Sequence, residues 1–184
     1  MDQRIDTQPK PPRPELAQPK PARADPRGAE PLAMHDLTEL LFFAYRDFVG
    51  DADRLLEAYR FGRAHHRVLH FVNRRPGLPI AELLDILKIT KQSLNRVLKD
   101  LLDAGFVEAR AGTDDRRQRL LHPTRKGRDL ALDLSRLQGA RFARALGELP
   151  GGAREAAIAF FLAMIEPGER GRIEALVWPG GARA

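Results

Sequence analysis

The 184-residue sequence contains no cysteine. Disulfide bonds, thiolate metal ligands, cysteine nucleophiles and thiol-based peroxide sensing are therefore excluded. The sequence also has no apolar run of about 18 residues, the length that a membrane-spanning helix requires. Its first residues lack the apolar core of a signal peptide. From these absences we expect a soluble cytoplasmic protein with no membrane partner.

Motifs for catalysis are missing as well. The sequence has no nucleophile motif, no glycine-rich phosphate-binding loop and no paired metal-binding motif, so we expect neither an enzyme nor a cofactor. His66 and His70 stand four residues apart, a spacing that can bind a metal, but no cysteine or acidic ligand pair accompanies them. Polar histidines, or histidines in an effector pocket, are the better interpretation.

Positive charge is abundant and concentrated. The formal net charge is +6 and the isoelectric point is about 10.1. Residues 88–128 hold 11 Lys and Arg against 5 Asp and Glu, which equals the excess of the whole chain. A polyanion is therefore the first partner to consider, although a solvated basic face would have the same charge.

Composition divides the chain into three parts. Residues 1–33 hold 8 of the 14 prolines and almost no large apolar side chains, so they are expected to form a disordered arm. Residues 34–166 have the periodic apolar pattern of one folded domain. Within it we expect a DNA-binding lobe at about 62–124 and dimerisation helices at about 36–60 and 125–166. Residues 167–184 are expected to be a flexible tail.

The two ends of this domain are more apolar than a surface helix requires. A helix begins near Asp36, is interrupted at Gly50 and resumes as a short segment to Tyr59, and Phe42 and Phe43 widen its apolar face. A helix over 154–165 is apolar on nearly every side. Such faces need a partner, and packing against a second chain supplies one. Burial inside a single domain remains an alternative for the first helix.

The segment 78–124 has the order of a winged helix-turn-helix. A helix follows Pro79, Thr90 is a good N-cap for a second helix over 91–104, and Gly105 ends it. Alternating residues then predict strands at 106–110 and 118–122, joined by a charged turn. The predicted fold is mainly α with a small β-hairpin wing.

The second helix of this segment has two different faces. Its apolar residues gather on one side, and polar and basic residues near its N-terminal half gather on the other. Amide side chains pair with adenine, and Arg or Lys pairs with guanine. The residues predicted to read bases are Gln92, Asn95, Arg96 and Lys99. A plain solvent-facing helix would more often contain Glu–Lys pairs, and this face has no acid before Asp100.

These residues and the following hairpin resemble the MarR family of bacterial transcriptional regulators. The resemblance covers roughly 36–165 and rests on IAELLDILKITKQSLNRVLKDLLDAGFV and DDRRQRLLHPTRKG. By this resemblance Arg117 would enter the minor groove, Asp115 would support it, and Thr124 would open the next helix. Pro123 and Arg125 depart from the family pattern, which could displace that junction. FFAYRDF and FGRAHHRVLHF also resemble a PetP-like subgroup.

The resemblance implies a homodimer on a pseudo-palindromic double-stranded DNA operator, most often as a repressor that a small molecule releases. Contacts to phosphates would come from Lys91, Ser93, Arg116 and Arg119. An effector, for example an aromatic carboxylate, would bind between the dimer helices and the lobe, at Phe43, Tyr45, Arg46, Arg63, His65 and His66. A packed interface with surface arginines explains these six residues as well. The alternative function is a protein–protein adaptor with only nonspecific DNA affinity, because winged helices also serve as scaffolds.

Overall fold

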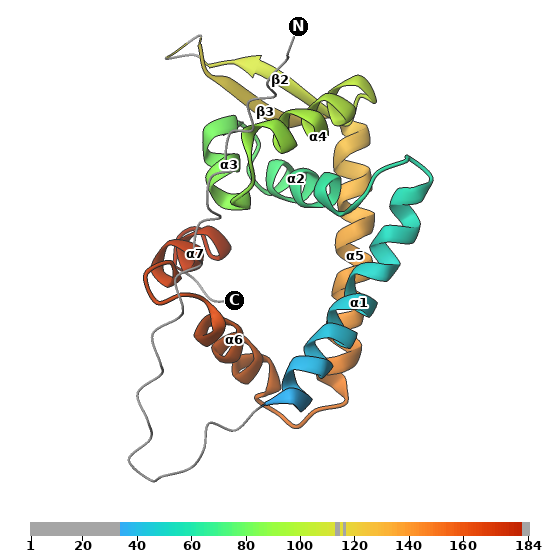
Figure 1. The fold of residues 1–184 in the computed structure, drawn as a ribbon, viewed down its shortest axis with the longest axis vertical. Helices are drawn as coiled ribbons and strands as arrows, with labels where there is room; N and C mark the ends of the chain where they lie inside the picture. Colours follow the sequence, from blue (N-terminus) through green and yellow to red (C-terminus); the bar gives the residue numbers. More distant parts are fainter. Residues whose placement is uncertain (1–33, 113–114, 116, 182–184) are drawn as a thin grey trace, which may run out of the picture.

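A computed structural model describes residues 34–112, 115 and 117–181, and it shows a mainly helical chain with one small sheet (Figure 1). The elements follow in the order α1 (His35–Glu57), α2 (Arg63–Arg74), β1 (Leu78–Pro79), α3 (Ile80–Leu87), α4 (Lys91–Asp103), β2 (Val107–Ala111), β3 (Arg119–Pro123), α5 (Arg125–Gly147), α6 (Ala153–Met164) and α7 (Arg170–Val177). The predicted fold, mainly α with a hairpin wing, is confirmed. The predicted arm over 1–33 lies outside the described residues.

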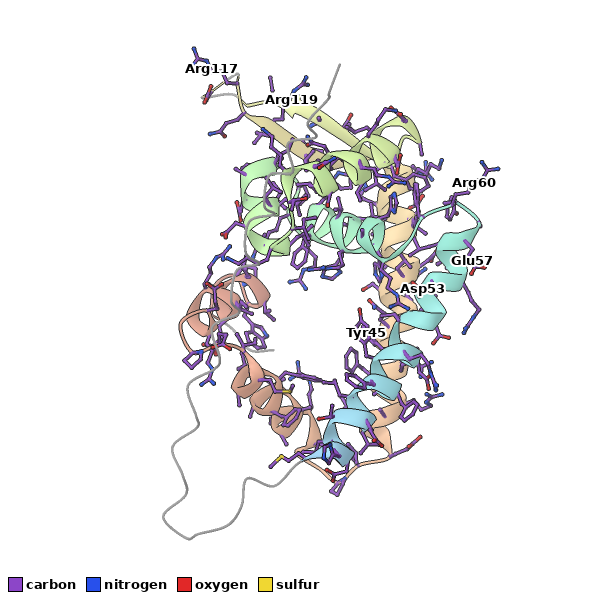
Figure 2. All side chains as sticks on the ribbon, viewed as in Figure 1. Tyr45, Asp53, Glu57, Arg60, Arg117 and Arg119 are labelled. Atoms are coloured by element: carbon purple, nitrogen blue, oxygen red, sulfur yellow. The ribbon has the colours of Figure 1, made fainter. Side chains whose placement is uncertain are left out.

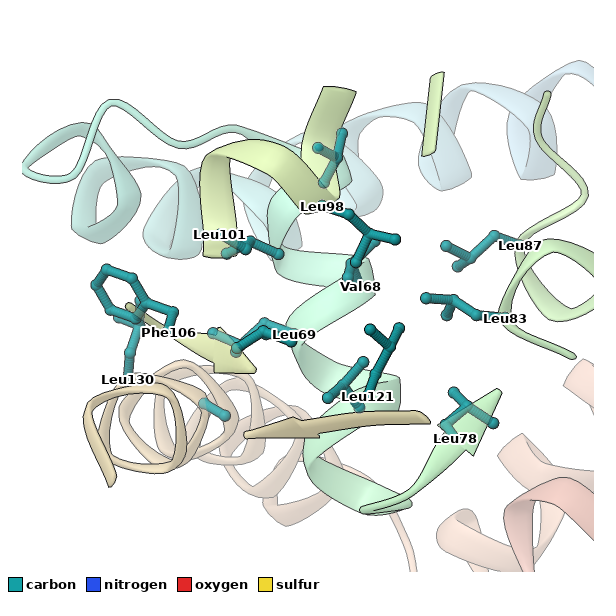
Figure 3. Close-up of a cluster of buried hydrophobic side chains, with 14 of the residues drawn as sticks. Val68, Leu69, Leu78, Leu83, Leu87, Leu98, Leu101, Phe106, Leu121 and Leu130 are labelled. Carbon is teal, nitrogen blue, oxygen red and sulfur yellow. The ribbon is translucent and has the colours of Figure 1, made fainter. Parts of the chain in front are cut away.

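The core of the molecule sits in the lobe built from α2, α3, α4 and the sheet, and the end of α1 and the first part of α5 pack against it (Figure 3). The sheet is antiparallel with the order β1-β3-β2, and Leu78 pairs with Leu121 in its register. Helix α2 runs through the middle of the lobe and contributes Val68 and Leu69, which are fully buried. Helices α3 and α4 each turn one apolar stripe toward this core, so their opposite faces remain in solvent.

Local signals in the sequence fix the ends of the helices. The Thr90 hydroxyl accepts a hydrogen bond from the Ser93 amide at 3.2 Å, which caps α4. The Thr124 hydroxyl accepts one from the Gly127 amide at 3.1 Å, which caps α5. Pro123 pairs with Val107 at the end of β3, so the departure from the family pattern does not displace this junction.

A long helical arm extends from the lobe. Helix α5 leaves the lobe and α1 packs along it, as Figure 1 shows. The Asp51 carboxylate accepts a 2.7 Å hydrogen bond from the Arg141 guanidinium, which lowers the pKa of Asp51. The rings of Phe48 and Phe142 lie 5.3 Å apart. Helices α6 and α7 then return toward the lobe on the other side of the molecule.

Three features differ from the sequence-based expectations. Helix α1 continues through Gly50, because the burial of Val49, Ala52 and Leu56 offsets the cost of about 1 kcal/mol for an interior glycine. The short strand β1 was not predicted, since two residues show no periodicity. Helix α7 lies within the segment expected to be a flexible tail. No helix in the described part of the chain is long and apolar enough to cross a bilayer.

Candidate nucleic-acid interface

Helix α4 presents its predicted base-reading residues to solvent. Gln92, Asn95 and Arg96 are exposed, and none of their side chains forms a hydrogen bond or ion pair within the described ranges. The opposite face is anchored by buried Leu94, Leu98 and Leu101. Leu102, expected on this apolar side, is 37% exposed because it lies at the edge of the stripe. The helix therefore offers three uncommitted polar side chains on a rigid base.

Lys99 differs from these three residues. Its ammonium group pairs with the Asp103 carboxylate one turn later, and this hydrogen bond raises the pKa of Lys99. A contact between Lys99 and DNA would have to compete with this pair. The sequence pattern placed Lys99 on the polar face, but it did not show that Asp103 would hold it.

The N-terminus of α4 carries exposed groups that are able to bind an anion. Lys91 and Ser93 are exposed in the first turn, where the backbone amides give the helix end a partial positive charge. The Ser93 hydroxyl accepts a 2.9 Å hydrogen bond from the Thr90 hydroxyl, so its own proton remains available for an acceptor. This geometry suits the phosphate contacts predicted for both residues.

The wing projects from the lobe beside α4, and Arg117 and Arg119 lie exposed near its tip (Figure 2). The Asp115 carboxylate accepts a 2.9 Å hydrogen bond from the backbone amide of Arg117. Asp115 thus braces the turn through the main chain, whereas the sequence suggested support of the guanidinium itself. Arg116, predicted to contact phosphate, lies outside the described residues.

A histidine that the sequence placed in an effector pocket instead braces α4. His65 Nε2 lies 3.1 Å from the Asp100 carboxylate, and His65 Nδ1 accepts a 3.1 Å hydrogen bond from the Gly62 amide. Since Nδ1 is an acceptor, Nε2 carries the proton that Asp100 accepts. The His65 ring also stacks on Phe61 at 4.7 Å. His65 and Asp100 therefore fix α4 to the start of α2, a link over 35 residues that no sequence spacing reveals.

The remaining predicted effector residues are only partly gathered. The Arg63 guanidinium donates to Asp53 at 3.0 Å and lies 5.7 Å from the Tyr45 ring centre, and Asp53 also faces half-buried His66. Figure 2 shows Tyr45 and Asp53 on the inner side of α1. Arg46 and Phe43 instead pair with each other, at 5.1 Å from cation to ring centre. Because Asp53 neutralises Arg63, an anionic ligand would have to displace it.

Helix α2 has two half-buried histidines whose pKa values are lowered. Desolvation is the main cause for both, and for His70 the nearby His66 and Arg74 add to it. No three potential metal ligands of the types His, Cys, Asp and Glu gather within the described part of the chain. At neutral pH these two residues are therefore uncharged, partly buried side chains within the lobe.

Stability is therefore expected to fall with acid. In the unfolded chain His66 and His70 bind protons below about pH 6.5, whereas in the folded lobe they bind them only at lower pH. Their contribution is complete above that value and is lost as the pH falls through the lowered pKa of the folded state. The urea midpoint of unfolding is measured at about pH 7.5 and at about pH 5.5. The difference between the two midpoints should be smaller for a His66→Gln/His70→Gln variant than for the unmodified protein. Exposed His35→Gln is the control, and an unchanged pH dependence in the double variant would contradict the assignment.

Comparison with known proteins agrees with this architecture. The family model described as MarR family matches residues 61–118. The HTH-type transcriptional regulator PetP of Rhodobacter capsulatus is 53% identical over 103 residues, which are 56% of this chain and 62% of PetP. The match thus spans less than two thirds of that relative's length.

Solved structures share the fold. A crystal structure of MarR superposes with a TM-score of 0.60 at 21% identity, covering 79% of this chain and 97% of MarR. Streptococcus pneumoniae FabT in complex with DNA gives a TM-score of 0.62 at 18% identity, covering 70% of this chain and 92% of FabT. The helix-turn-helix and the wing thus form a MarR-type winged helix-turn-helix lobe, since residues 61–118 match the MarR family and the fold agrees with that of MarR.

Proposed function

We propose that this protein is a homodimeric, sequence-specific DNA-binding regulator of transcription, acting as a repressor that a small ligand releases. The observation that carries the proposal is the exposed face of α4, where Gln92, Asn95 and Arg96 have no partner within the described residues. Amide and guanidinium groups on such a face can pair with base edges in a major groove. The name of the relative PetP, a transcriptional regulator, supports the same function.

The lobe suggests how each element would meet a duplex. Helix α4 enters the major groove by its N-terminal half, while Lys91, Ser93 and Arg119 contact phosphates on either side. The wing then brings Arg117 to the adjacent minor groove, with its turn braced by Asp115. Two such lobes would bind half-sites about 34 Å apart, which corresponds to one turn of a pseudo-palindrome.

The proposal of a homodimer rests on apolar surface at the far end of the arm. Helix α6 has no buried residue, and Phe160 and Phe161 are about half exposed. Together with Leu37, Leu41 and Met164 they line an open apolar cavity of about 510 Å³ between α1 and α6. Surface of this kind in a chain of this size indicates a protein interface, and a second copy is the partner that the proposed regulator requires.

Ligand release rests on the cluster of Tyr45, Asp53, Arg63 and His66 beside the lobe. An aromatic carboxylate could stack on Tyr45 and take Arg63 from Asp53, since the exchange replaces one carboxylate by another. A calorimetric screen of phenolic and pyridine carboxylates should find a binder whose affinity falls in an Arg63→Ala variant. A screen without any binder would remove this part of the proposal.

The decisive experiment measures fluorescence anisotropy on the promoter region of the protein's own gene, with excess nonspecific DNA and at two salt concentrations. Binding that resists the competitor but weakens with salt is expected, because base contacts give specificity and phosphate contacts release counterions. Equal loss to any competitor would indicate a basic surface without base readout. The adaptor function would then be the better explanation.

Replacing Arg117 with alanine should weaken specific binding by about 1–3 kcal/mol, because a minor-groove arginine is lost. The same anisotropy assay measures the effect. Arg136→Ala is the matched control, since it removes the same charge from an exposed pair with Asp133 on the arm. If both variants bound the operator equally well, the assignment of Arg117 to the minor groove would be wrong.

A further inference from the structure

Helix α7 is a segment that neither the wing nor the recognition helix accounts for. It follows α6 after a short turn, and Arg170 at its start binds the end of α6. The Arg170 guanidinium donates to the carbonyl oxygens of Ile165 at 2.9 Å and Ala163 at 2.8 Å. These bonds satisfy carbonyl groups that a helix end leaves unpaired, so α6 and α7 are joined with a defined angle.

The other end of α7 is bound to the lobe. Arg75, in the turn after α2, donates to the carbonyl oxygen of Leu176 at 2.8 Å, and Arg74 donates to that of Val177 at 3.3 Å. Arg75 also reaches the Glu82 carboxylate of α3 at 3.3 Å. Cations at the negative end of a helix are favourable, and here they connect α7 with both α2 and α3.

Four alternating charges close a ring between α7 and α3. Asp85 pairs with Lys88 at 2.9 Å and with Arg172, while Glu169 pairs with Arg172 at 3.3 Å and lies 3.9 Å from Lys88. The hydrogen bond from Lys88 is the main cause of the lowered pKa of Asp85, and the charge of Arg172 adds to it. A closed network is worth more than separate exposed pairs, because each charge has two partners.

Apolar side chains also line the space between α7 and the lobe. Ile173 and Leu176 of α7 face Ile86 of α3 across two small cavities, and Phe71 of α2 borders one of them. All four of these apolar side chains are partly buried. Helix α7 is therefore bound to the lobe by hydrogen bonds and ion pairs, and its apolar side chains line the cavities between the two.

The position of this contact matters for the recognition helix. Lys88 is the C-cap of α3 and adopts a left-handed conformation with φ of 51°, so it forms the turn that sets the angle between α3 and α4. We propose that α7 positions the helix-turn-helix relative to the helical arm, with Arg75, Glu169 and Arg172 as positioning residues. This inference rests on the proposed function, because a fixed angle between lobe and arm would set the separation of two recognition helices in a dimer.

The test compares three variants of the full chain. Arg172→Ala breaks the ring, Ile173→Ser/Leu176→Ser removes the apolar lining that α7 contributes, and Arg136→Ala is the control with an equal loss of charge. Hydrogen exchange of α3 amides, measured without DNA, reports whether α7 holds the lobe. We expect exchange to rise about twofold to fivefold in Arg172→Ala, to rise further in the double variant, and to stay unchanged in the control.

The second readout separates positioning from simple stabilisation. Operator affinity is measured for the natural half-site spacing and for versions with one base pair inserted or removed at the centre. Loss of α7 docking should reduce the ratio between natural and altered spacings by about twofold to fivefold, since a loosely held lobe tolerates other separations. A variant that is merely less stable would bind all three operators more weakly and keep the same ratio.

The possible outcomes are distinct. Unchanged exchange in the double variant would overturn the docking of α7. Raised exchange with an unchanged spacing ratio would leave α7 as a stabilising helix and overturn its positioning role. If the unmodified protein bound no DNA specifically, the proposed function and the positioning role would fail together, and the exchange data would still show whether α7 docks.

Discussion

Replacing Gly127 with alanine is expected to lower the free energy of unfolding by about 3 kcal/mol. A Cβ atom at this position would lie far inside van der Waals contact of the Phe106 carbonyl oxygen and 3.0 Å from its carbon. That oxygen also accepts a 3.1 Å hydrogen bond from the Thr124 amide. The start of α5 would have to move away from β2, and the Thr124 cap would be strained with it. Urea unfolding followed by circular dichroism measures the change.

The matched control is Gly139→Ala on the same helix. A Cβ atom at Gly139 meets nothing within 4 Å, so the substitution should stabilise the protein by about 0.5–1 kcal/mol through helix propensity alone. The same substitution is thus expected to lower the free energy of unfolding at Gly127 and to raise it at Gly139. If Gly127→Ala were as stable as the unmodified protein, the close approach of α5 to β2 would be wrong.

Replacing Phe161 with glutamate should weaken the free energy of association of the proposed homodimer by about 4 kcal/mol or more. Its dissociation constant should then rise on the order of a thousandfold. Phe161 is 50% exposed in the single chain and lines the apolar cavity between α1 and α6. Two-fold symmetry would place an uncompensated carboxylate in the interface twice. Sedimentation equilibrium measures the dissociation constant, and operator affinity should fall with it.

Leu132→Glu provides the control for this experiment. Leu132 is a similarly exposed apolar residue, 48% accessible, on the part of α5 that does not line this cavity. Its replacement should leave the association state unchanged. A Phe161→Glu variant that stayed as associated as Leu132→Glu would show that α6 is not the interface, and the proposal of a dimer through α1 and α6 would fall.

The sequence by itself determined the order and most limits of the helices and strands. Thr90 and Thr124 mark helix starts, Gly105 marks a stop, and the apolar residues of α4 repeat at helical spacing, so these features are readable one turn at a time. The polar face with Gln92, Asn95 and Arg96 follows from the same periodicity. The similarity of the lobe to the MarR family was also expected from local motifs, and the family model over residues 61–118 and PetP agree with it.

The tertiary structure alone decided which of these side chains are committed to partners. Asp100 pairs with His65, which lies 35 residues earlier in the chain. Asp103 forms an ion pair with Lys99, and Asp53 forms one with Arg63. Helix α7 could not be expected from the sequence, because its eight residues have little amphipathic pattern. Its ends are bound by Arg75 and Asp85, which lie about a hundred residues earlier in the chain. Periodicity reports on neighbours along one helix, whereas ion pairs and docked ends depend on which distant elements the core brings together.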